Sequence, residues 1–275
     1  MRFDIASESV PCGERPPIRS RTKIFFSRHF ISPRPLRGDM ERDELLEAST
    51  PPAREAGWRP LSETATAASE ASAAPVVETG TTVVGVTAAE AVVLAADRRA
   101  SLGGRFVTNK CVRKVEQVHP TAAVALSGAV GHIQRFVRVL RAESTLYADR
   151  RGKPPSIQAL VTLAGNVLGD APLSVTPLLG GVDADGPRVF SLDGAGGVLA
   201  DTYAAGGSGM QPAYGVLERE YDADLSASEA SALAARAVGA ASERDTASGN
   251  GLSVAVVDTE GVTVSEYDAS EEVTA

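Results

Sequence analysis

The order in which strand-like and helix-like segments follow one another is the feature that most limits the fold of this chain. After residue 80, β-branched and apolar runs indicate strands, and apolar residues at helical spacing indicate helices. The expected strands are 81–87, 91–97, 122–126, 175–182, 188–192, 198–204, 252–258 and 262–267, and the expected helices are 131–147, 156–169, 212–221 and 226–243. Because strands and helix pairs come in blocks without a βαβ alternation, we expect an α+β fold of antiparallel sheets with helices outside.

The first part of the chain differs from the rest. Residues 1–78 lack sustained periodicity, and the stretch LSETATAASEASAAPVV is nearly all Ala, Ser, Thr and Glu. Such a composition predicts a disordered leader. Met40 opens an acidic part of this leader. Translation therefore starts either at Met1 or at Met40. If it starts at Met40, residues 1–39 do not belong to the protein. The composition changes sharply at Gly80, where the globular domain is expected to begin.

Composition excludes several classes of function. The longest apolar runs are shorter than the roughly 18 residues that cross a bilayer. Cys12 and Cys111 are too few for a disulfide framework, which favours a reducing cytoplasm, and the three histidines show no metal-ligand spacing. A net charge of −8 without a Lys/Arg run argues against nucleic acid, and the GGSG sequence lacks the Lys-Ser/Thr of a phosphate-binding loop. We expect no metal, no cofactor and no membrane partner.

Thr81 is the candidate nucleophile. A Thr-Thr pair at the head of a strand is ordinary by itself, since threonine suits strands. Here it follows a disordered leader that ends in Thr79-Gly80, and cleavage after Gly80 would give Thr81 both a hydroxyl and a free α-amine. The ordinary pKa of an α-amine, about 7.7 to 8.0, lets it act as a base near neutral pH. One residue would then supply nucleophile and base.

Asp97 and Lys114 are the charged candidates around Thr81. In a hairpin that begins at Thr81, the end of the second strand returns towards the start of the first, which brings Asp97 near Thr81. The alternatives for Asp97 are a solvated turn or a surface ion pair with Arg98 or Arg99. By its pattern alone, Lys114 is a solvent-facing lysine in an alternating stretch.

From Thr81 onward the sequence resembles the archaeal, in particular haloarchaeal, proteasome β subunits, which are N-terminal-nucleophile threonine peptidases. Seven motifs carry the resemblance in the right order: TGTTVVGV, AADRRASLG, VRKVEQVHP, ALSGAVG, LLGGVD, AAGGSGMQPAYGVLEREY and ERDTASGNG. The resemblance implies a four-layer αββα sandwich for residues 81–275. It also implies that residues 1–80 are a propeptide removed on maturation, by attack of Thr81 on the carbonyl of Gly80.

The resemblance assigns roles to further residues. It implies that Asp97 orients the ammonium of Lys114, with Arg113 as the fallback because the loop Leu102–Cys111 is one residue longer than usual. Gly128 would donate its N–H to the oxyanion. The side chains around the freed amine would be Ser208, Asp245 and Ser248, although Asp245 by itself is compatible with a helix end and Ser208 with a flexible loop. An apolar specificity pocket of Ala100, Val112, Leu126 and Val130 would favour cleavage after hydrophobic residues.

The same resemblance implies partners. These are α subunits and other β subunits in seven-membered stacked rings, a regulatory ATPase that acts through the α ring, and unfolded polypeptide as substrate. The helix His132–Arg151 is a candidate for ring contacts. Three alternatives remain open at this point: a non-catalytic structural β subunit, the bacterial ATP-dependent protease whose subunits also begin Thr-Thr, and another amidase of the superfamily with a small closed pocket.

Overall fold

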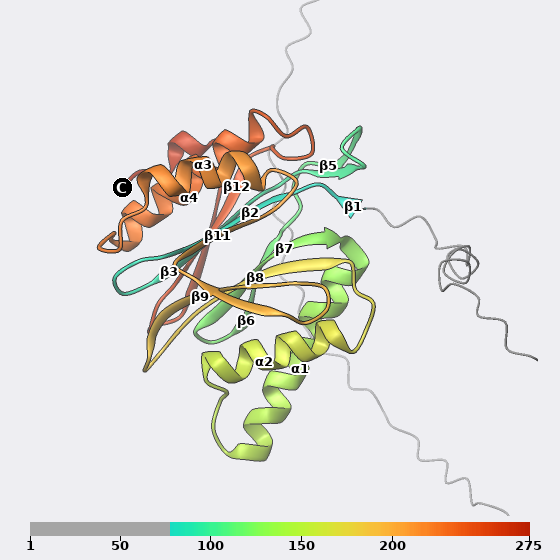
Figure 1. Ribbon diagram of the computed structural model, residues 1–275, viewed down its shortest axis with the longest axis vertical. Coiled ribbons are helices and arrows are strands. Elements are labelled where there is room, and N and C mark those ends of the chain that lie inside the picture. Colours follow the sequence, from blue (N-terminus) through green and yellow to red (C-terminus); the bar gives the residue numbers. More distant parts are fainter. Residues whose placement is uncertain (1–77) are drawn as a thin grey trace, which may run out of the picture. The chain divides into compact units, whose positions relative to one another are not determined.

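The structure is a computed structural model that describes residues 78–275 (Figure 1). The expectations about the leader and about the start at Met1 or Met40 therefore lie outside the described residues. No helix in the described part is long and apolar enough to cross a membrane.

Thirteen strands and four α-helices make up the described part of the chain. The strands are β1 (Glu78–Thr79), β2 (Thr82–Thr87), β3 (Val92–Asp97), β4 (Ala100–Leu102), β5 (Phe106–Asn109), β6 (Val115–His119), β7 (Ala122–Ala129), β8 (Val175–Asp183), β9 (Gly186–Leu192), β10 (Val198–Asp201), β11 (Tyr203–Gly207), β12 (Leu252–Val257) and β13 (Val262–Tyr267). The helices are α1 (Val130–Arg151), α2 (Ile157–Gly169), α3 (Met210–Glu220) and α4 (Ala227–Ser242), and a 3-10 turn, η1 (Ser270–Glu272), lies near the C-terminus.

The strands form two large antiparallel sheets and a small hairpin. One sheet has the order β11-β2-β3-β12-β13, and the other has the order β1-β7-β8-β9-β10. Strand β6 also pairs with β7, through Ala122–Ala125, while β1 pairs with Gly128 and Ala129. Since β8 occupies the other edge of β7, β1 and β6 share one edge of this strand. Strands β4 and β5 form the separate hairpin.

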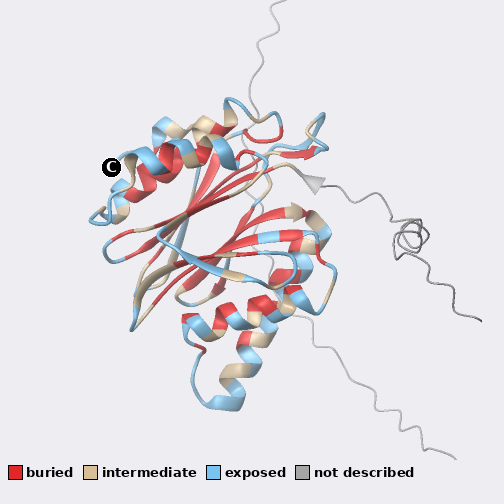
Figure 2. Ribbon diagram, in the orientation of Figure 1, coloured by how far each residue is buried: buried red, intermediate tan, exposed pale blue. Residues whose placement is uncertain are grey.

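The two sheets are packed between two layers of helices. Helices α3 and α4 cover the β2–β3 sheet, and α1 and α2 cover the β7–β8 sheet (Figure 1). The expected four-layer αββα sandwich is thus confirmed. Figure 2 shows that the central strands of both sheets consist mainly of buried residues.

The burial of both faces explains the sequence of the central strands. Val83 packs in the core between the sheets, whereas its neighbour Val84 packs against α3 and α4. Successive side chains of a strand point to opposite faces, so a sheet that is covered on both sides needs apolar residues at every position. On the other side of the molecule, Phe136, Leu160 and Leu179 belong to the core between α1, α2 and their sheet.

Helices α2 and α4 each start at a serine that caps them. Ser156 caps α2 by accepting a hydrogen bond from the N–H of Ala159. Ser226 and Glu229 form a complete capping box at the start of α4, as the sequence predicts. A cap of this kind contributes about 1 kcal/mol to stability.

One predicted strand is wrong. The segment expected as a single strand, 198–204, is split into β10, which pairs with β9, and β11, which pairs with β2 in the other sheet. Thr202 lies between the two, and its carbonyl accepts hydrogen bonds from the N–H and the hydroxyl of Thr87. No glycine or proline marks this crossing, so local pattern does not detect it. Strands β1, β4, β5 and β6 are also absent from the prediction.

Candidate active site

The Gly80–Thr81 bond lies between β1 and β2. Thr81 is fully buried and Gly80 is half-buried. Upstream of the bond, β1 runs antiparallel to β7 with Thr79 opposite Gly128, and β1 also contacts β4. The residues before the bond therefore lie as an added strand on the edge of a sheet, which is a common way to bind extended peptides.

A buried ion pair lies beside the start of β2. Lys114 Nζ donates to Asp97 Oδ1 at 2.8 Å, and the N–H of Thr82 donates to the same oxygen at 2.9 Å. The other oxygen, Oδ2, accepts from the N–H groups of Arg99 and Gly249, both at 3.0 Å. Asp97 is 0% and Lys114 1% exposed. Four donors thus hold the carboxylate in one position, as a buried charge requires.

The position of Asp97 follows from the hairpin of β2 and β3. Val83 pairs with Ala96, so Asp97 comes opposite Thr82 at the open end of the hairpin, as the sequence predicts. Lys114 reaches it from the residue before β6. The neighbouring Arg113 points elsewhere, since its side chain is 62% exposed and its guanidinium lies 3.9 Å from Glu266. The structure therefore brings Lys114, and not Arg113, to the carboxylate.

Burial lowers the pKa of Lys114 below its ordinary value, and the Asp97 carboxylate opposes this effect by charge and by hydrogen bonding. Asp245 also favours the charged form at longer range, and Arg99 disfavours it. In this buried site the charged form of Lys114 would exert a strong field on a nearby amine or oxyanion, because little water screens it.

Asp97→Asn is expected to destabilise the protein most at neutral pH, by on the order of 3 kcal/mol, because it removes one charge of a buried pair. Without the carboxylate the pKa of Lys114 falls further. Between that pKa and the unfolded value of about 10.4, the unfolded chain binds more protons, so the free energy of unfolding rises with pH. Urea denaturation at a series of pH values checks this. A difference from wild type that stays constant up to about pH 10 contradicts the explanation.

A second set of hydrogen bonds links Thr81 and Thr82 to Asp245. The hydroxyls of Ser208 and Ser248 both donate to Asp245 Oδ2, at 2.6 and 2.7 Å. Ser208 Oγ accepts from the N–H of Thr81 at 3.0 Å, and Ser248 Oγ lies 2.8 Å from Thr82 Oγ1. Because the proton of Ser248 is already donated to Asp245, Thr82 is the donor in the last contact. The nitrogen of Thr81 is thus connected through Ser208 to a carboxylate.

Gly128 occupies a place where no other residue fits. Its φ is +133°, and a Cβ here would lie 2.1 Å from the carbonyl oxygen of Ser174. A hollow of ≈ 380 Å³ lies beside the bond, and Gly80, Gly128 and Ser208 line it together with Ser127 and Ser174. Gly128 and the candidate cleavage bond therefore border the same hollow.

The comparison with known families agrees with this geometry. The model of the family described as "Proteasome subunit" matches residues 77–257, which is well over half of the chain. The chain belongs to the proteasome subunit family. Its members form a protein-degrading protease assembled from several subunits.

Within the proteasome subunit family, the chain is similar in type to the β subunits of haloarchaea. A proteasome subunit beta of Halorhabdus utahensis is 59% identical over 191 residues, which cover 69% of this chain and 82% of that protein. A proteasome subunit beta 2 of Haloterrigena turkmenica is 56% identical over 195 residues, or 70% of this chain and 82% of that one. The proteasome subunit beta 2 of Haloarcula marismortui is 55% identical over 193 residues, or 70% and 84%. This chain is accordingly a haloarchaeal proteasome β subunit.

None of the four residues predicted for the specificity pocket lines the hollow beside the Gly80–Thr81 bond. Ala100 is buried on β4, Val112 is half-buried before β6, and Val130 is half-buried at the start of α1. Leu126 on β7 is fully buried in the core beneath α1 and α2. Their role in substrate selection stays a prediction. Among the residues that the structure describes, no group of three or more His, Cys, Asp or Glu is placed to hold a metal ion.

Two residues of the β subunit site were missed by the sequence analysis. Thr82 contributes its N–H to Asp97 and its hydroxyl to Ser248. Its place opposite Asp97 follows from the hairpin register, which could have revealed it. Arg99 contacts Asp97 through its N–H, but its guanidinium reaches a segment near residue 250. No local pattern in the sequence signals that contact.

Proposed function

We propose that this β subunit is a threonine endopeptidase, with Thr81 as nucleophile after its own cleavage of the Gly80–Thr81 bond. The observation that carries the proposal is that two hydrogen-bonded networks meet at Thr81 and Thr82. One is the pair of Lys114 and Asp97, and the other is the chain of Ser208, Asp245 and Ser248. A subunit with a purely structural role has no need of a fully buried lysine at this point, since burying such a charge is costly.

The networks support a definite sequence of proton transfers. In the mature chain the α-amine of Thr81 would accept the proton of the Thr81 hydroxyl while Oγ1 attacks the substrate carbonyl. The ammonium of Lys114 would keep the amine neutral beforehand, and the N–H of Gly128 would stabilise the oxyanion. The amine would then pass its proton to the leaving nitrogen, which leaves an ester on Thr81. Water, activated by the same amine, would hydrolyse the ester.

Maturation would use the same hydroxyl on the chain itself. Oγ1 of Thr81 would attack the carbonyl carbon of Gly80 while the hydroxyl proton passes to the peptide nitrogen, which leaves as the new α-amine. Water would then hydrolyse the resulting ester between Gly80 and Thr81, which restores the Thr81 hydroxyl and releases the leader as residues 1–80. The amine would remain near Ser208, which already accepts a hydrogen bond from the nitrogen of Thr81. The mature subunit would comprise residues 81–275.

Substrates would lie where β1 lies in the uncut chain, as an extended strand beside β7 and β4. Backbone pairing of this kind does not depend on sequence, which suits a protease for unfolded polypeptides. Ala100, Val112, Leu126 and Val130 would favour hydrophobic residues before the cut. We further propose that the subunit assembles in the cytoplasm into seven-membered β rings stacked on α rings, and that a regulatory ATPase acts through the α ring.

The direct test is to co-express the full chain with its α partner and to determine the mass and N-terminus of the β chain in the assembled particle. We expect an N-terminus at Thr81 together with hydrolysis of peptides that carry leucine before the cut, in preference to arginine or aspartate. An assembled particle with an uncut and inactive β chain would instead establish a structural subunit.

A further inference from the structure

Arg99 links the catalytic hairpin to a segment about 150 residues away. Its Nε donates to Oδ1 of Asn250 at 2.9 Å, and its Nη1 donates to the carbonyl oxygen of Thr246 at 2.8 Å. These two acceptors lie on either side of Ser248 and Gly249. The planar guanidinium therefore spans the middle of the segment 245–251 with two hydrogen bonds, as only arginine can.

The segment 245–251 supplies three groups to the site. Asp245 accepts from Ser208 and Ser248, Ser248 accepts from Thr82, and Gly249 donates its N–H to Asp97. A displacement of the segment would therefore disturb both hydrogen-bonded networks together. Positioning errors of about 1 Å at such groups can reduce turnover roughly 10²-fold.

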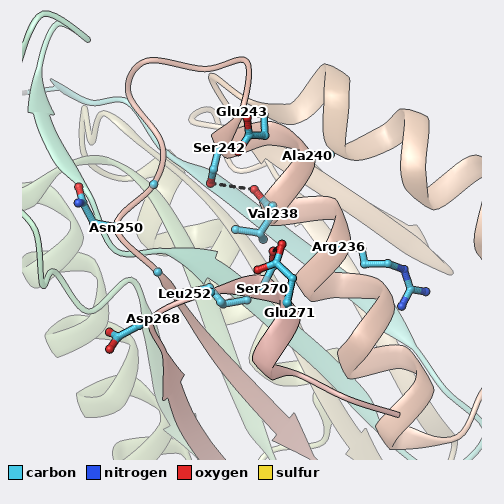
Figure 3. A pocket seen from close by; sticks show the side chains of 14 residues that line it. Arg236, Val238, Ala240, Ser242, Glu243, Asn250, Leu252, Asp268, Ser270 and Glu271 are labelled. Carbon is cyan, nitrogen blue, oxygen red and sulfur yellow. Dashed lines mark hydrogen bonds between the residues drawn. The ribbon is translucent and has the colours of Figure 1, made fainter.

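The conformation of this segment is unusual and depends on support from outside. Gly249, Asn250 and Gly251 all have positive φ, at +138°, +62° and +83°. On one side a hollow of ≈ 400 Å³ separates the segment from the end of α4, and the Asn250 side chain points away from that helix (Figure 3). On the other side the guanidinium of Arg99 lies directly against Gly249, where a Cβ would come within 2.6 Å of Nη2.

We infer that Arg99 is a positioning residue for peptide hydrolysis, which clamps the segment 245–251 so that Asp245, Ser248 and Gly249 meet Thr81, Thr82 and Asp97 in working geometry. This inference rests on the proposed function. It assigns to Arg99 no contact with the substrate. What Arg99 supplies is the two-pronged contact with Thr246 and Asn250, and its positive charge alone is not sufficient.

The test compares Arg99→Lys and Arg99→Met with wild type in particles assembled from the full chain and its α partner. Lysine keeps the charge but cannot span the two acceptors. We expect both variants to lower kcat for peptide hydrolysis roughly 10²-fold and to leave KM within about twofold, since substrate binding is not touched. If Arg99→Lys had wild-type activity, the inference that Arg99 holds the segment 245–251 would be wrong. If the wild-type particle itself were inactive, the proposed function would be refuted instead.

Asn250→Gly removes the acceptor of the hydrogen bond from Arg99 Nε. This variant tests the inference even if the Arg99 variants do not assemble. Glycine accepts a φ of +62° without strain, so the substitution removes only the acceptor. We expect a kcat about fivefold lower, an unchanged melting temperature, and no additional loss when it is combined with Arg99→Met. Additive losses, or a wild-type kcat in Asn250→Gly, would contradict the clamp.

Arg98→Met is the matched control. Arg98 is an adjacent and more deeply buried arginine, but its guanidinium pairs with Glu266 and Asp268 and not with the segment. We expect this variant to lower the melting temperature while kcat stays within about twofold of wild type. An equal loss of kcat in Arg98→Met would show that any buried arginine here acts through general stability, which would overturn the inference.

Discussion

Thr81→Ala is expected to leave the leader uncut and to lower peptide hydrolysis by at least roughly 10⁴-fold, because the substitution removes the group that would attack both the Gly80 carbonyl and the substrate. Thr81 is fully buried, but losing one hydroxyl and one methyl group from it leaves a small cavity, so assembly should survive. Mass and N-terminal determination on the assembled particle, together with hydrolysis of a fluorogenic peptide, measure the two effects.

Two other threonine substitutions sharpen this result. Thr81→Ser keeps a hydroxyl and, after cleavage, an amine, so we expect it to be processed and to retain part of the activity. Thr87→Ala changes a threonine at the far end of β2, where the hydroxyl contacts Thr202 and Tyr221. This control should be processed and active like wild type. Correct cleavage of Thr81→Ala in the absence of any wild-type chain would show that another protease removes the leader.

The position of Asp97 beside the start of β2 could be predicted because it depends on local structure. A hairpin of two strands places its two open ends together whatever the rest of the fold, so Asp97 had to come near Thr81 once 81–97 was identified as a hairpin. The block order of strands and helices likewise determined the layers, since each amphipathic element must bury one face. Local pairing and burial thus account for most of the fold.

The remaining parts of the site depend on contacts between distant residues. Lys114 was identified as the partner of Asp97 only through the family resemblance, because its own sequence neighbourhood is that of an exposed lysine. Its burial arises from the pairing of Val115 with Ala125, which places the residue before β6 inside the sandwich. Arg99 is a similar case, since its acceptors belong to the segment between α4 and β12.

The crossing at Thr202 shows the same limit in the fold. The strand pattern of 198–204 is continuous, and each half is well suited to a strand. What divides it is the existence of two partners, β9 and β2, that lie in different sheets. A periodic pattern reports that a residue is extended and half-buried, but it does not report which strand it pairs with. This crossing also brings the following Ser208 to the start of β2.

Lys114→Met is expected to lower kcat for peptide hydrolysis roughly 10³-fold, within the range for a group that assists proton transfer, while the particle still assembles. The reason for the intact assembly is the set of donors that remains around Asp97. Its two oxygens keep the N–H groups of Thr82, Arg99 and Gly249, and methionine fills much of the space of the lysine stem. The lost function is therefore the ammonium and not the architecture.

Arg113→Met provides the matched comparison, because it removes the same charge from the adjacent residue. Its side chain is 62% exposed and its contact with Glu266 is 3.9 Å long, so we expect processing, kcat and melting temperature close to those of wild type. Measuring kcat, KM and the fraction of processed chain for both variants separates a buried catalytic charge from the general charge of the region. Equal losses in the two variants would assign the effect to the general charge, and a loss confined to Lys114→Met would support its role beside Thr81.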